Sequence, residues 1–137
     1  MIWFMLIMGH IMGDYILQPK AMAMGKDITK NPLGTALFWS ITHSILYSYC
    51  VCIWLGQWSW PALVLIFITH WPIDAFSLGD RWLSVIQGRT IQQAAEDVGV
   101  GKDFNVAFTA VVYTVVDNWW HLALMTPVVL LIQKGLV

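Results

Sequence analysis

The stretch that decides the fold is FTAVVYTVVDNWWHLALM, residues 108–125. It is an apolar run near the end of the chain, and it carries Asp117 and His121 one helical turn apart. Side chains four residues apart lie on the same face of a helix. Ionisable groups inside a membrane span are costly, and they face the interior of the helix bundle when they occur. The stretch therefore predicts a membrane helix with one polar stripe directed at neighbouring helices.

The composition of the whole chain also indicates lipid as the solvent. Of its 137 residues, 58% are hydrophobic and 11% are charged, whereas soluble domains carry about 25% charged residues. The mean hydropathy is +0.67, and the chain contains 9 Trp and 7 Met. The net charge of −1 and the lack of a basic stripe exclude nucleic acid as a partner. At this length we expect residues 1–137 to form a single transmembrane domain.

Four apolar segments have about the length that a bilayer requires, which is roughly 20 residues with a range near 17–25. The first of them is at the short limit. Within lipid the backbone must satisfy its own hydrogen bonds, so each segment should be a helix. We therefore predict an all-α integral membrane four-helix bundle with spans at about 2–17, 33–55, 60–78 and 106–132.

The connections between the spans predict the orientation in the membrane. Positive charge gathers in the first and third connections, at Lys20, Lys26, Lys30, Arg81, Arg89 and Lys102, and the other side holds only Lys134. Because cytoplasmic loops carry the excess of Lys and Arg, both termini should lie outside. Residues 90–98 predict a short amphipathic cytoplasmic helix between the third and fourth spans, closed by Gly99 and Gly101.

Each predicted span holds one of the four histidines of the chain: His10, His43, His70 and His121. Three of them have an aspartate four residues away: Asp14, Asp74 and Asp117. At about 1.5 Å per residue the four helices place these groups at similar depths, biased toward the cytoplasmic half. Either each His–Asp pair fastens the bundle, or all seven groups converge on one or two metal ions. Seven groups exceed what fastening requires, so we favour a divalent transition metal.

Imidazole and carboxylate ligands suit zinc, which we favour, and also iron or manganese. Asp14, Asp74 and Asp117 are the candidate catalytic residues, either as general base or as groups that orient a histidine. Gln18 continues the stripe of His10 and Asp14 by one more turn and is expected at the cytoplasmic mouth, where Asn118 points partly inward.

These motifs resemble those of a bacterial and phage family of small membrane proteins, known as domain of unknown function 3307. The similar segments are GHIMGDYILQPKAMAMGK (9–26), the lone His43, THWPIDAF (69–76) and DNWWHL (117–122). The first block, with its H-x3-D-Y-x-L-Q pattern, is the most specific, and the chain has Asn118 where the family commonly has Gln. The resemblance implies a multi-pass protein of the bacterial inner membrane that is also found in phages. The patterning is similar in style to that of inner-membrane metal-dependent hydrolases.

The leading hypothesis is a membrane-embedded metal-dependent hydrolase that acts on a lipid or on a membrane-accessible phosphate or ester. The alternatives are a metal-ion or proton transporter or channel, a haem-binding electron carrier, and a non-catalytic phage membrane factor. A transport path needs polar residues toward the outer side, where the sequence shows few. The paired aspartates argue against a haem carrier, because axial haem ligands need no carboxylate beside each histidine. The expected partners are membrane lipid and a second copy of the chain in a homodimer.

Overall fold

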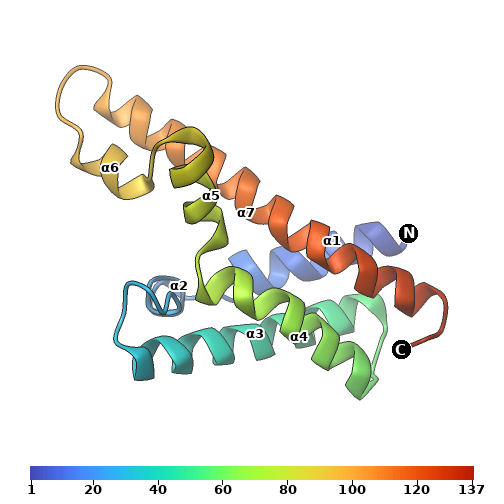
Figure 1. The fold of residues 1–137 in the computed structure, drawn as a ribbon. Helices are drawn as coiled ribbons and strands as arrows, with labels where there is room; N and C mark the ends of the chain where they lie inside the picture. Colours follow the sequence, from blue (N-terminus) through green and yellow to red (C-terminus); the bar gives the residue numbers. More distant parts are fainter.

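The computed structural model describes residues 1–137, and its secondary structure consists of helices without strands, which confirms the all-α prediction. The elements, in chain order, are α1 (Ile2–Ile11), the π-helical turn η1 (Met12–Ile16), α2 (Lys20–Gly25), α3 (Leu33–Leu55), α4 (Trp60–Ala75), α5 (Leu78–Gln87), α6 (Ile91–Glu96) and α7 (Lys102–Gln133) (Figure 1).

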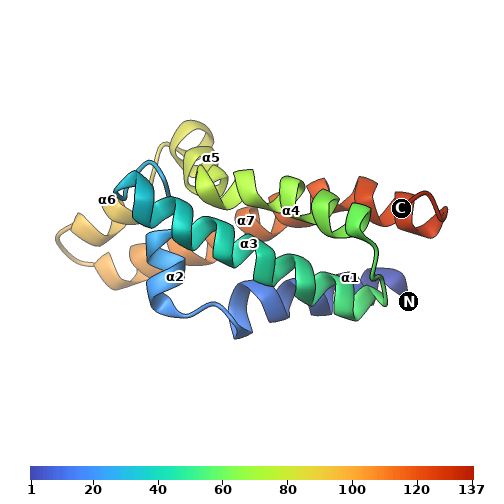
Figure 2. The ribbon, with the colours of Figure 1, turned by 90° about the horizontal axis from the view of Figure 1, so that it is seen from below.

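Helices α1, α3, α4 and α7 lie side by side and form the body of the molecule (Figures 1 and 2). Helix α1 packs on α3, α3 packs on α4, and α4 packs on α7. Both termini lie at one end of this bundle, and α2, α5 and α6 lie toward the other end. The polar connections of the sequence are therefore gathered away from the termini.

Two helices, α3 and α7, are long and apolar enough to cross a membrane. A third candidate is formed by α4 and α5 together, which are bent by 51° at the break between them. The apolar helix over Ile2–Ile16 is shorter than these. Helix α3 has the bounds that the sequence predicted, whereas α5 and α2 were not predicted as helices.

Local sequence explains where the central helices end. Helix α3 stops at Leu55 because Gly56 adopts a left-handed backbone with φ of 66°, which glycine tolerates without strain. Helix α4 starts at Trp60 because the Ser59 hydroxyl accepts the amide N–H of Ala62 at 3.2 Å, with Pro61 in the first turn. These two signals produce the tight turn between α3 and α4.

Helix α4 ends at Ala75, earlier than residue 78, the limit predicted for the third span. Ser77 has φ of 47°, and this left-handed residue turns the chain from α4 into α5. The bend is held by the first connection, because Asp27 accepts a 2.6 Å hydrogen bond from the Ser77 hydroxyl and Ile28 N–H donates to the carbonyl of Ala75 at 3.0 Å. Burial opposes the charge on Asp27, but its hydrogen bonds from Ser77 and Thr29 lower its pKa.

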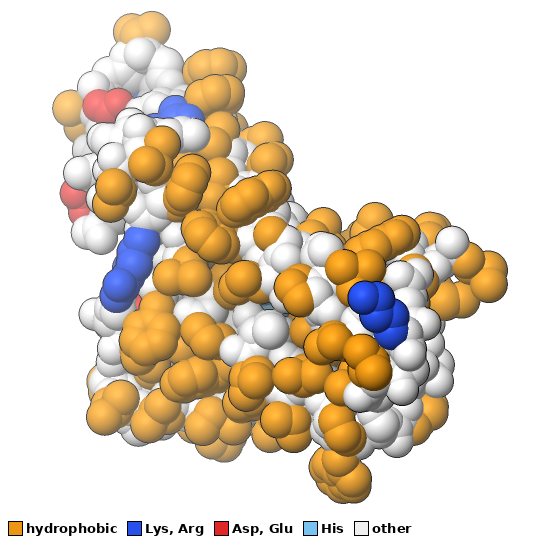
Figure 3. Space-filling model, turned by 45° about the vertical axis from the view of Figure 1, so that its right-hand side comes forward, with side chains coloured by type: hydrophobic (Ala, Val, Ile, Leu, Met, Phe, Trp, Pro, Cys, Tyr) orange, Lys and Arg blue, Asp and Glu red, His pale blue; other side chains and the backbone are white.

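The outer faces of the bundle are apolar, the reverse of a soluble protein. On α3 the exposed side chains recur every three or four residues: Phe38, Ile41, Ile45, Tyr49 and Ile53. Figure 3 shows hydrophobic side chains over most of one side of the molecule, with few charges among them. Such a surface fits contact with lipid.

Glycine allows α1 to approach α3 closely. A Cβ added at Gly9 would lie 2.8 Å from the Cα of Val51, and one added at Gly13 would lie 2.8 Å from Cδ2 of Tyr47. Glycines four residues apart are a common device for close helix packing in membranes. The contact presses the intervening His10 and the following Asp14 toward α3.

The end of the bundle near the termini is filled by an apolar core. It consists of Leu6, Tyr47, Val51, Cys52, Leu55, Ala62, Ile66, Met125, Val128, Val129 and Ile132. In each of the four helices these residues lie on the terminal side of the histidine, and the nearest of them is four residues away from it. The polar groups are therefore closed off from that end.

Candidate metal centre

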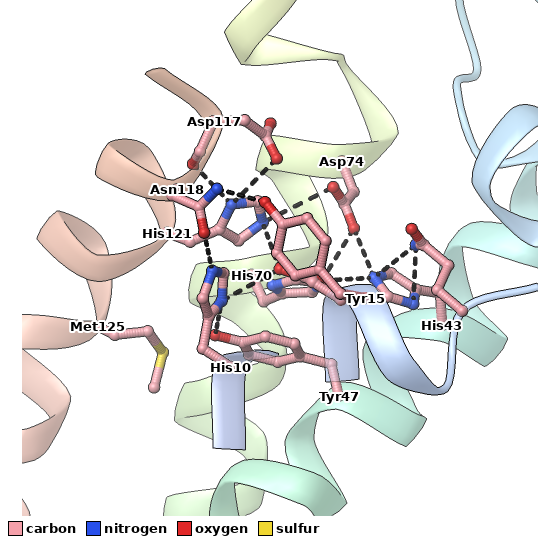
Figure 4. A network of polar contacts seen from close by, with 12 residues as sticks. His10, Tyr15, His43, Tyr47, His70, Asp74, Asp117, Asn118, His121 and Met125 are labelled. Carbon is pink, nitrogen blue, oxygen red and sulfur yellow. Dashed lines mark hydrogen bonds and ion pairs between the residues drawn. The ribbon is translucent and has the colours of Figure 1, made fainter. Parts of the chain in front are cut away.

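The four histidines meet inside the bundle, one from each of α1, α3, α4 and α7 (Figure 4). His43, His70 and His121 are completely buried, and His10 is 2% exposed. The rings of His70 and His121 have centroids 4.6 Å apart, and those of His43 and His70 are 5.0 Å apart. The side chains that the sequence placed at similar depths are thus neighbours in space.

Two aspartates join three of these histidines. Oδ2 of Asp74 lies 2.9 Å from Nε2 of His43 and 3.0 Å from Nε2 of His70. Oδ1 of Asp14 lies 2.9 Å and 3.7 Å from the same two nitrogens. Nε2 of His121 lies 3.7 Å from Oδ1 of Asp74 and 3.9 Å from Oδ2 of Asp14. The Nε2 atoms of His43, His70 and His121 therefore each lie within 3.9 Å of both carboxylates.

The cluster contains two donor sets that could hold a metal ion, and they share Asp74. In each set, one ligand atom per residue lies within 4.8 Å of all the others. The sets are Asp14, His43, His70 and Asp74, and Asp74, Asp117 and His121. Six of the seven predicted ligands are therefore brought together.

Several donor atoms of the cluster lack a well-directed hydrogen bond. Nδ1 of His70 and Nε2 of His121 are buried without a hydrogen-bond partner. Oδ2 of Asp14 and Nε2 of His70 are buried with ion-pair contacts alone, to His10 and Asp74. Buried polar atoms are nearly always hydrogen-bonded, so a group of unpartnered ones at one point needs a cation or protons to satisfy it. The residues present therefore fit a bound metal.

The orientation of His121 favours ligation through Nε2. Its Nδ1 lies 2.8 Å from the backbone carbonyl oxygen of Asp117, which only accepts, so Nδ1–H is the donor. The Nε2 lone pair is then free and faces Asp14 and Asp74. A backbone carbonyl that fixes the tautomer in this way is usual for histidines that bind metals.

His10 lies beside the two donor sets and belongs to neither. Its Nε2 is 2.6 Å from Oδ1 of Asn118, and its Nδ1 is 3.1 Å from both the Tyr47 hydroxyl and Oδ2 of Asp14. The amide of Asn118 also donates to the Tyr15 hydroxyl. His10 and Asn118 are thus placed to orient Asp14.

Lys26 is part of the cluster, although the sequence gave no reason to expect it there. Its Nζ lies 2.7 Å from Oδ2 of Asp74, and its side chain is only 14% exposed. Lys26 reaches the site from the turn after α2, so no helical spacing could mark it. Burial lowers the pKa of Lys26, but the charges of Asp74 and Asp14 outweigh burial and raise it.

Gln18 connects this lysine to the histidines. With the amide nitrogen donating to the backbone carbonyl of Asp14 at 3.1 Å, the amide oxygen lies 2.8 Å from Nζ of Lys26 and 3.1 Å from Nε2 of His43. With neutral histidines, the three aspartates and Lys26 together carry a formal charge of −2. One divalent cation would neutralise the cluster.

A cavity of about 260 Å³ opens next to the cluster, on the side of α2. Its lining is formed by Asp14, Tyr15, Gln18, Ala23, Met24, Lys26, Tyr113, Thr114 and Asp117. Gln18 is part of this lining. Asn118 is not in this lining, because its amide is engaged by His10 and Tyr15.

Fold and site together define an all-helical protein with two or three helices fit to span a membrane and a buried His/Asp cluster able to hold a metal ion. A family model described as "Protein of unknown function (DUF3307)" matches residues 2–136, so the chain belongs to this family. The match confirms the resemblance inferred from the motifs. The searches of curated proteins and of solved structures found no match.

Proposed function

We propose that the protein is a membrane-embedded metal-dependent hydrolase that acts on a lipid or on a membrane-accessible phosphate or ester. The observation that carries the proposal is the convergence of three Nε2 atoms and two carboxylates beside a cavity. Nitrogen and oxygen donors of this kind suit zinc, and also iron or manganese.

The proposal includes four membrane spans with both termini on the outer side. Support comes from the two termini lying at one end of the bundle, with most of the lysines and arginines in the connections at the other end. Helix α1 with η1 would be the shortest span. The bent α5 is amphipathic, with Val85 79% exposed and Leu83 buried, and would lie at the cytoplasmic surface.

Each polar side chain has a role in this scheme. His43, His70, His121, Asp14 and Asp74 would hold the metal, and His10 with Asn118 would orient Asp14. A bound divalent metal supplies Lewis-acid polarisation of a phosphate or ester oxygen and makes water a stronger nucleophile. Asp117 lines the cavity and borders the cluster, so it is placed to accept the proton of the attacking water.

The position of the cavity favours hydrolysis over transport. The cavity and the charged groups lie on the side of α2, whereas the apolar core fills the opposite side. A transported ion would need polar partners through that core, and its residues offer few. A lipid headgroup entering from the cytoplasmic surface would meet the cluster directly.

Metal content and hydrolysis test the proposal in detergent-purified protein. We expect about stoichiometric transition metal, and metal-dependent cleavage of a nitrophenyl phosphate, phosphodiester or ester in mixed micelles. Asp117→Asn should lower kcat by about 10²–10⁴-fold, the usual effect of removing a general base, and retain most of the metal. Wild-type protein without bound transition metal would refute the proposal. Asp103→Asn, on an exposed turn of α7, is the matched control.

A further inference from the structure

Lys26 is the cation that lines the cavity, where the other charged groups are Asp14 and Asp117. Lys20, at the start of α2, is exposed. Burying an ammonium is costly unless an anion accompanies it. Lys26 therefore needs an anionic partner when the metal and the substrate are bound.

In the structure that anion is Asp74, with Nζ of Lys26 2.7 Å from Oδ2. This oxygen is also the one that faces His43 and His70, at 2.9 Å and 3.0 Å. Lys26 and a metal on Asp74 would therefore contend for the same carboxylate. A divalent cation at Asp74 removes most of the attraction that holds the ammonium and adds repulsion between like charges.

Besides Asp74, Lys26 has two neighbours that matter here, the side chain of Gln18 and the cavity. The Gln18 oxygen, 2.8 Å from Nζ, takes one of its three N–H donors and brings no charge. The adjacent cavity of about 260 Å³ is several times the roughly 30 Å³ of a water molecule in the liquid. An anion bound there would restore a charged partner to the ammonium.

We propose that Lys26 binds a phosphate group of the substrate, which makes the substrate a phosphoester and not a carboxylic ester. The inference rests on the proposed function. A neutral ester would bring no negative charge to Lys26, which would then have to share Asp74 with the metal. A phosphate offers charge and acceptor oxygens to both cations at once. Lys26 is in this view a specificity-determining residue, whether the phosphate belongs to a lipid headgroup or to a soluble molecule.

The test is binding of inorganic phosphate to zinc-loaded protein in detergent, measured by isothermal titration calorimetry. The variants are Lys26→Met, Lys26→Gln and Lys26→Arg, with Lys20→Met as the matched control. We expect the two neutral variants to bind phosphate about ten- to a hundredfold more weakly, the usual effect of losing a charged hydrogen bond. Lys26→Arg and Lys20→Met should stay within a few-fold of wild type.

Zinc content, measured separately on each variant, distinguishes the two proposals. A wild type that binds neither zinc, iron nor manganese defeats the proposed function and this inference with it. Equal phosphate affinity in wild type and in a folded, zinc-loaded neutral variant overturns only the role of Lys26. Lys26→Gln keeps a polar group beside Gln18 and serves if Lys26→Met fails to fold. Glycerol phosphate and a short-chain phosphatidic acid in micelles then identify the source, because a headgroup site binds the lipid more tightly.

Discussion

His70 and His10 have the same sequence signature and different surroundings. Both are buried, and both stand four residues before an aspartate. Nε2 of His70 faces Asp74 and Asp14, whereas both nitrogens of His10 are engaged by Asn118, Tyr47 and Asp14. Spacing alone could predict that both project inward. It could not separate a ligand from a group that holds a ligand.

This difference leads to a prediction about metal affinity. His70→Gln removes a ligand and should abolish stoichiometric metal binding. His10→Gln should retain binding with about 10–100-fold lower affinity, as is typical when a group that orients a ligand is lost. Competition with a chromophoric chelator measures both affinities. Equal loss in the two variants would show that His10 binds the metal as directly as His70.

At the scale of elements, sequence pattern predicted the apolar helices and missed the short helices α2 and α5. The bounds of α3 were predicted because Leu33–Leu55 contains no Asp, Glu, Lys or Arg and Gly56 ends it. Helix α5 was missed because its apolar residues lie on one face within a polar stretch. The end of α4 depends on Asp27, 50 residues from Ser77 in sequence, and such a contact cannot be deduced from local pattern.

The close contact of α1 and α3 predicts the cost of filling it. Gly9→Ala would place a methyl group 2.8 Å from the Cα of Val51, so a backbone has to move. We expect a loss of about 1–3 kcal/mol in the free energy of unfolding, the usual range for overpacking. Gly34→Ala on α3 is the control, because no atom lies within 4 Å of the added carbon.

Thermal unfolding in detergent, followed by circular dichroism, compares the two alanine variants. Metal affinity is measured on the same samples, since η1, which continues α1, carries Asp14. Gly9→Ala should lower both the melting temperature and the affinity for metal, and Gly34→Ala should lower neither. Comparable stability of the two variants would contradict the close packing of α1 against α3.

At the scale of the whole molecule, the sequence predicted that seven groups would gather. It could not predict that six of them form two donor sets and that His10 lies beside them. Helical periodicity brings each His–Asp pair to one face, and the low tolerance of lipid for charge turns those faces together. The sharing of Asp74 between two donor sets, and the entry of Lys26 from a loop, depend on how the helices are placed in space.

The proposed orientation predicts where single cysteines can be labelled. Cys50 and Cys52 are buried, and both are replaced by alanine to provide a background. In intact cells a membrane-impermeant maleimide should label Lys134→Cys, near the end of the chain. It should label Lys20→Cys, in α2, only after the membrane is disrupted. Labelling of Lys20→Cys in intact cells would reverse the orientation.

The apolar core closes the cluster on the side of the termini, and the cavity lies on the opposite side. An ion bound to the cluster would enter and leave through this cavity, which is also the proposed route of substrate and product. A substrate molecule bound in the cavity would then block release of the ion. Exchange of the metal should therefore be slowest when the protein is saturated with substrate.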